Sequence, residues 1–138
     1  MFATRRRRAV RGCRTSKELV AALHRSQSEH SERMCSPGFA TFARIIEESP
    51  ALQAKELAVM AQFAQVLADA IRAELRTDER DARLAAGLLV SVQWQLFRAA
   101  RKQALAGKHG RAAVRRLRAE LDRAYQLLDQ GLGNIHAS

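Results

Sequence analysis

The two prolines of this chain restrict its fold strongly, because each follows a serine, at Ser36-Pro37 and Ser49-Pro50. Serine is a favoured helix N-cap, and proline is tolerated at the first helical position, where its missing N–H would have no partner inside the helix. Each pair therefore predicts a helix start. No other proline interrupts the chain, strand patterns are absent, and the residues that dominate are good helix formers. We predict an all-α fold.

The spacing of the apolar residues predicts a bundle of about five helices. In the third, Leu52, Val59 and Phe63 begin one apolar stripe. We expect Thr77 to end this helix and to cap the next, and residues 134–138 to fray. The five predicted helices cover residues 16–33, 37–48, 50–76, 78–106 and 111–131.

The last two helices predict a dimer. The fourth is apolar nearly all round between Leu84 and Ala100, which indicates burial on several sides. The fifth repeats its apolar residues with 3,4 spacing, the seam of a helix packed along another helix. Together they predict a four-helix bundle built by two copies, hence a homodimer. The candidate interface residues are Leu89, Val92, Leu96, Val114, Leu117, Leu121, Ala124 and Leu128.

The net charge of +10 is concentrated at the N-terminus. Residues 1–17 carry seven basic residues and no acid, whereas the rest of the chain has 17 Lys/Arg against 14 Asp/Glu. The high pI alone therefore does not indicate nucleic-acid binding. No apolar region follows the arginines, as a secretory signal would require, although an Arg-rich leader poor in acids also keeps a transit peptide open.

No catalytic constellation is visible, so we do not expect an enzyme or a cofactor. Cys13 and Cys35 stand apart, which favours neither a disulfide framework nor a zinc site and fits a reducing compartment. The histidines are scattered, and His24 and His30 do not share a helix face, so we expect no metal site. No stretch is apolar enough to predict a membrane span.

The aromatic side chains leave two interpretations open. They either form the core of the bundle or line a small-molecule pocket between helices, where a few polar groups would orient a ligand. Buried polar groups on the fourth helix would need partners, on a ligand or across a dimer interface. The candidate pocket residues are Phe42, Met60, Phe63, Gln93, Trp94 and Phe97.

Two stretches, "FARIIEESPALQAKELAVMAQFAQVLADAI" and "DARLAAGLLVSVQWQLFRAAR", resemble the C-terminal regulatory domain of TetR/AcrR-family transcriptional repressors. The resemblance covers residues 38–132, and we assign residues 36–133 to this domain. It implies a cytoplasmic bacterial regulator that binds a small, often apolar effector. It also implies dimerisation through the last two long helices.

A second resemblance lies upstream, where "TSKELVAAL" is similar to the opening of the helix that joins the family's DNA-binding and regulatory domains. We assign residues 15–35 to this linker helix. The resemblance implies that Lys17 contacts a DNA phosphate. Cys13 and Arg14, however, replace the family's aromatic pair, and residues 1–14 cannot supply a helix-turn-helix, which needs further packed helices. We expect these residues to be a disordered leader.

The resemblance predicts the effector-binding and dimerisation domain of a transcriptional regulator, whose DNA-binding head is absent or vestigial. DNA is then a partner only if an intact head exists upstream. The alternative is a headless dimer that binds a small molecule, or a heterodimerisation partner, without specific DNA binding. For the arginine run, a start-site or reading-frame artefact, a disordered basic arm and a degenerate head all remain open.

Overall fold

A computed structural model describes residue 8 and residues 10–130, and all regular secondary structure in this part of the chain is helical. The all-α prediction is confirmed. Helices α3 and α4 begin at Pro37 and Pro50, and every other bound lies within three residues of its predicted place. The elements are α2 (Ser16–His30), the 3-10 helix η1 (Arg33–Cys35), α3 (Pro37–Glu47), α4 (Pro50–Leu75), α5 (Glu79–Leu105) and α6 (Arg111–Gln130).

Side-chain caps define the starts of the two longest helices. The Ser49 hydroxyl accepts a hydrogen bond from the backbone N–H of Leu52 at 3.2 Å, as its place before Pro50 predicts. The prediction for α5 was wrong by one residue: its N-cap is Asp78, not Thr77. The Asp78 carboxylate accepts a hydrogen bond from the backbone N–H of Asp81 at 2.8 Å. Asp81 is the third helical residue after the cap, one of the two positions that an N-cap side chain reaches.

Ser36 starts α3 in a different way. Its hydroxyl donates to the carbonyl oxygen of Arg33 at 2.8 Å and makes no side-chain cap for α3. The fixed φ of Pro37, rather than a capping hydroxyl, therefore defines this helix start.

Arg76 ends α4 in the left-handed conformation, with φ 53° and ψ 37°. A residue with a Cβ pays roughly 1–2 kcal/mol there, and the entropy cost of glycine, roughly 0.5–1 kcal/mol, offsets only part of the gain from removing this penalty. Arg76→Gly is therefore expected to raise the free energy of unfolding by about 0.5–1 kcal/mol in urea denaturation. Arg72→Gly, inside the helix, is the control and is expected to lower it by about 1 kcal/mol. Equal losses in both variants would contradict this interpretation.

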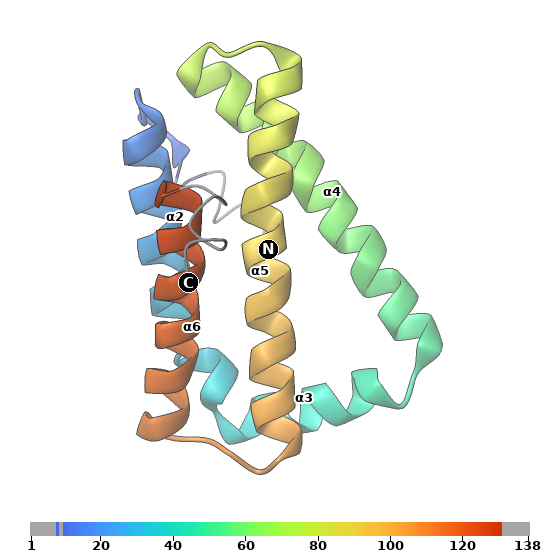
Figure 1. Cartoon of the computed structure of the whole chain (residues 1–138). Coiled ribbons are helices and arrows are strands. Elements are labelled where there is room, and N and C mark those ends of the chain that lie inside the picture. The colour runs from blue at the N-terminus through green and yellow to red at the C-terminus, as the bar shows by residue number, and fades with distance from the viewer. Residues whose placement is uncertain (1–7, 9, 131–138) are drawn as a thin grey trace.

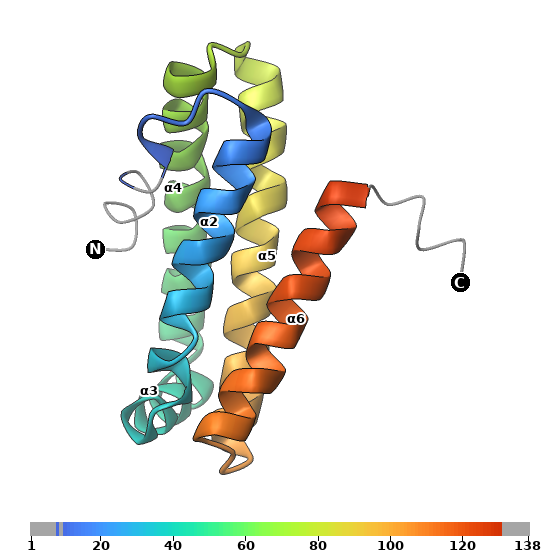
Figure 2. The same ribbon diagram turned by 90° about the vertical axis from the view of Figure 1, so that its left-hand side faces the viewer.

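The helices form two groups on either side of α5 (Figure 1). The C-terminal end of α4 lies next to the start of α5, and from there the two helices diverge. Helix α3 closes the base of the resulting triangle. Helices α2 and α6 lie on the other side, and Figure 2 shows α2 beside α5. Helix α5 packs against α3, α4 and α6, while α2 packs against α6. None of the described helices combines the length and apolar character needed to cross a membrane.

The apolar seam of α6 packs inside a single chain. Leu117 and Leu121 are each 1% exposed and belong to the same core as Leu19 and Leu23 of α2. Of the other candidate interface residues, Leu89, Val92 and Leu96 are buried in this core, and Val114, Ala124 and Leu128 are partly buried against it. The seam does pack along other helices, but α2 and α5 of the same chain cover it. These side chains therefore offer little surface to a second copy.

The apolar composition of α5 predicted burial on several sides, but one side of the helix is exposed. Leu84 and Leu88, one turn apart, are 62% and 51% exposed. The neighbouring helices cover α5 on its α4 and α6 sides and leave this stripe open.

Part of the predicted disordered leader belongs to the fold. Val10 is completely buried and Cys13 is buried beside the same core, so the prediction was wrong for these residues. The backbone N–H of Gly12 donates to the Glu74 carboxylate at 3.2 Å, which attaches this segment to the end of α4. Burial raises the pKa of the Cys13 thiol. Residues 1–7 and 9, and the predicted fraying tail 134–138, lie outside the described residues.

Candidate functional site

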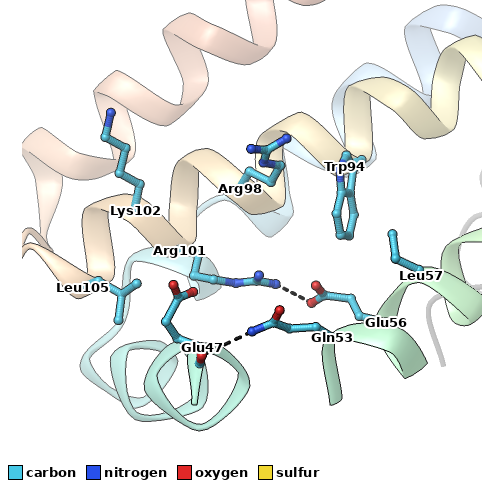
Figure 3. Close-up of a pocket in the computed structure, with 9 residues that line it drawn as sticks. All are labelled: Glu47, Gln53, Glu56, Leu57, Trp94, Arg98, Arg101, Lys102 and Leu105. Carbon is cyan, nitrogen blue, oxygen red and sulfur yellow. Dashed lines mark hydrogen bonds and ion pairs between the residues drawn. The ribbon is translucent and has the colours of Figure 1, made fainter. Parts of the chain in front are cut away.

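A pocket of about 470 Å³ opens in the triangle formed by α3, α4 and α5 (Figure 3). Its size falls within the range of small-molecule sites, roughly 300–1,000 Å³. The walls come from the end of α3, the first two turns of α4 and the C-terminal half of α5. The lining residues are Glu47, Gln53, Glu56, Leu57, Trp94, Arg98, Arg101, Lys102 and Leu105.

An ion pair between Glu56 of α4 and Arg101 of α5 crosses this pocket. The two side chains are only 12% and 13% exposed, so the pair is largely removed from water. Glu56 Oε1 and Arg101 Nε are also buried and have no hydrogen-bond partner among the described residues. Each such atom costs roughly 1–3 kcal/mol in desolvation. The pair thus joins the two walls but leaves part of their hydrogen-bonding capacity unused.

Gln53 fixes the corner between α3 and α4. Its side-chain amide donates to the carbonyl oxygens of Ile46 at 3.1 Å and Glu47 at 3.2 Å. These carbonyls belong to the last turn of α3, and that of Ile46 also accepts from the backbone N–H of Ser49 at 3.1 Å. The amide therefore holds the base of the pocket in place.

The remaining walls are apolar or cationic. Figure 3 shows the Trp94 ring extending from α5 toward Leu57 of α4, with Leu105 at the other end of the pocket. Arg98 and Lys102 emerge on the opposite side of α5 from Arg101. The arrangement can bind a molecule that places an apolar body against Trp94 and a polar group near Arg101.

Of the six predicted pocket residues, only Trp94 lines this pocket. Phe63 and Phe97 are buried in the core, and Met60 is partly buried against it. Phe42 is 47% exposed on α3, where it contacts Phe39 with 5.8 Å between ring centroids. The core interpretation therefore holds for Phe63 and Phe97, and their side chains are not available to a ligand in this pocket.

Gln93 finds its polar partner inside the chain. At 1% exposure, it accepts a hydrogen bond from the Gln27 side chain of α2 at 3.0 Å. The Tyr125 hydroxyl of α6 donates to the side-chain carbonyl oxygen of Gln27. His24 stacks on Tyr125 at 4.5 Å and contacts Asp122 at 2.7 Å. This polar network joins α2, α5 and α6 and lies apart from the pocket.

Lys17 is exposed in the first turn of α2. This position allows a phosphate contact, which stays a prediction. No group of three His, Cys, Asp or Glu side chains suited to a metal ion occurs in the described part of the chain.

The polar lining of the pocket was missed by the sequence analysis. Its signal was weak: Gln53 and Glu56 fall three residues apart on α4. Such a pair shares a helix face, but most such pairs on helices are solvent-exposed.

In comparisons with known proteins, no family model, no curated protein and no solved structure matches this chain.

Proposed function

We propose that this chain is the effector-binding domain of a TetR-like transcriptional repressor, and that the pocket between α3, α4 and α5 binds the effector. The observation that carries the proposal is the pocket itself, in which Trp94 and Leu57 face each other across two long helices near a buried ion pair. The site is concave and within the size range of small-molecule sites, and it combines three apolar lining residues with six polar or charged ones.

The lining favours an amphipathic effector. Three cations and two carboxylates line the pocket, and the Glu56–Arg101 pair uses one of each. A ligand carboxylate that approaches Arg101 competes with Glu56 for the guanidinium. Because these two residues stand on different helices, such a ligand shifts the balance between arrangements of α4 and α5. In the proposed regulator this shift transmits effector binding to the DNA-binding head.

The second candidate is a headless dimer that binds the same ligand without specific DNA binding. Exposed Leu84 and Leu88 supply apolar surface for a second copy, since the seam of α6 is used within the chain. Sequence preference in DNA binding separates the two candidates: a regulator with an intact head retains it as salt rises, whereas a headless dimer shows none.

Trp94 is the only tryptophan of the chain, so its fluorescence reports on the pocket directly. Naphthalene-2-acetate, an amphipathic carboxylate, is expected to change this fluorescence saturably and to raise the melting temperature. At 100 times its Kd the stabilisation is about 2.7 kcal/mol. Naphthalene, without the carboxylate, is expected to bind more weakly.

The matched variants are Leu57→Glu and Leu84→Glu. Both leucines are exposed, at 59% and 62%, so neither substitution disturbs the core. Leu57→Glu places a carboxylate in the pocket and is expected to weaken binding, whereas Leu84→Glu, remote from the pocket, leaves it unchanged. Equal binding by both variants, or no response of Trp94 to either compound, would contradict the proposal.

A further inference from the structure

The C-terminal half of the chain contains a long stretch without acids. Residues 82–119 include nine Lys/Arg and no Asp or Glu. The structure folds this stretch into most of α5, the following turn and the first half of α6. Because the two helices form a hairpin whose turn is at the lower end of the molecule in Figure 1, its cations other than Arg83, which lies near the start of α5, are brought toward this end.

Six of these cations are exposed and lie within about two turns of the hairpin turn, and we call this group the basic end. Each is exposed, and none forms an ion pair with a described residue. By contrast, Arg101 pairs with Glu56, and Arg118 pairs with Glu32 at 3.4 Å. The basic end consists of Arg98, Lys102, Lys108, Arg111, Arg115 and Arg116.

The cations at the start of α6 do not serve helix stability. The first turn of α6 holds no acid, although acids are the favoured residues there. Arg111 instead opens the helix, where the positive end of the helix dipole disfavours a cation by roughly 0.3–1 kcal/mol. The hairpin turn is held in place, since the N–H of Gly110 donates to the carbonyl oxygen of Cys35 at 3.4 Å. The cations therefore project from a turn that is held in place, and Arg111 does so although the helix dipole disfavours it.

The surroundings of the basic end indicate a phosphate-rich partner. Among its six members four are arginines, whose planar guanidinium groups match phosphate geometry. On α5 and α6, Leu105 at 44% exposure is the large apolar residue exposed beside these cations, and no aromatic ring of these two helices is exposed there. Phe42 and Ile45 of neighbouring α3 are also exposed, at 47% and 53%. The hairpin that carries the cations therefore offers little of the apolar or aromatic surface on which membrane docking and most protein interfaces depend. The phosphate backbone of a nucleic acid needs none.

We propose that the basic end binds the phosphate backbone of double-stranded DNA without reading its bases. This surface lies at the opposite end of α2 from Lys17, and thus away from the place where a DNA-binding head would attach (Figure 1). It overlaps the effector pocket at Arg98 and Lys102, whereas none of its α6 cations lines the pocket. In a head-bearing regulator the basic end would make a second, sequence-independent contact with DNA.

The test is fluorescence anisotropy of the full chain with a labelled 30-base-pair duplex across a salt series. The variant Arg111→Glu/Arg115→Glu/Arg116→Glu removes three phosphate contacts. Its slope of log Kobs against log salt is expected to become shallower by about 2.7, at about 0.9 per phosphate. Because acids near the start of α6 suit the helix dipole, the variant is expected to fold, and circular dichroism checks this.

The control variant is Arg25→Glu/Arg72→Glu/Arg80→Glu, which changes the net charge by the same amount at three exposed positions on α2, α4 and the start of α5. It is expected to keep most of the slope. Equal losses in both variants would show that net charge or the N-terminal arginines bind the duplex, and would overturn the proposal. So would an unchanged slope in the first variant, or stronger binding to phosphatidylserine vesicles than to DNA that depends on the same arginines.

Discussion

Leu117→Ala is expected to lower the free energy of unfolding by about 2–5 kcal/mol, whatever the protein concentration. Leu117 is 1% exposed in the core formed by α2, α5 and α6, so its truncation leaves a cavity within one chain. Urea denaturation at two protein concentrations, tenfold apart, provides the measurement. If the seam of α6 were instead a dimer interface, the stability of the parent chain would rise with concentration, and Leu117→Ala would reduce this dependence.

The control for this prediction is Leu88→Ala. Leu88 is 51% exposed on α5, and its truncation is expected to change the stability by no more than about 0.5 kcal/mol. A large, concentration-dependent loss from Leu88→Ala would instead place the contact between copies on the exposed stripe of α5.

The second large effect is expected from Arg101→Ala. Removing one partner of a buried ion pair leaves the other charge uncompensated, at a cost of about 3–5 kcal/mol. The double variant Arg101→Met/Glu56→Leu is expected to recover most of this loss, because it also removes the two buried atoms without partners. Chemical denaturation of the parent and both variants measures the difference.

Arg83→Ala is the matched control for the ion pair. Arg83 and Glu79 are both 65% exposed and 3.6 Å apart, and such a surface pair contributes about 0–1 kcal/mol. If Arg101→Ala costs no more than Arg83→Ala, then Glu56 and Arg101 are hydrated in solution and the pocket is more open than described.

Helix positions in this chain follow from local signals, and for that reason they could be predicted. Ser49 and Pro50 fix one start with a cap and a rigid φ, both properties of adjacent residues. The missed cap at Asp78 shows the limit of such signals, since Thr77 and Asp78 are both good capping residues and only the chain geometry selects one.

The partner of the α6 seam could not be predicted from the sequence, because the second half of α2 looks too polar to pack against an apolar seam. Gln27 and Ser31, which make its second half appear solvent-exposed, are 2% and 0% exposed. Each is satisfied inside the chain: Gln27 by Gln93 and Tyr125, and Ser31 by donating to the carbonyl oxygen of Gln27 at 3.1 Å. Polar pairs of this kind leave no apolar pattern, so the sequence analysis assigned the seam to a second copy.

The pocket was only partly predictable for a related reason. Trp94 was found because a large aromatic residue is conspicuous in any sequence. Glu56 pairs with Arg101, 45 residues later in the chain. This pairing depends on the angle between α4 and α5, which the local sequence does not encode. Helical periodicity gives the face of a residue on its own helix but not the face of the helix that it meets.

The hydrogen bond between Tyr125 and Gln27 has a consequence for how the protein is made. Its two residues stand 98 positions apart, so α2 cannot complete its packing until α6 has been synthesised. At about 5–20 residues per second, a nascent α2 waits roughly 5–20 s with Leu19 and Leu23 uncovered. Translation speed and chaperone access over that interval therefore bear on the yield of folded protein, in addition to the stability of the finished bundle.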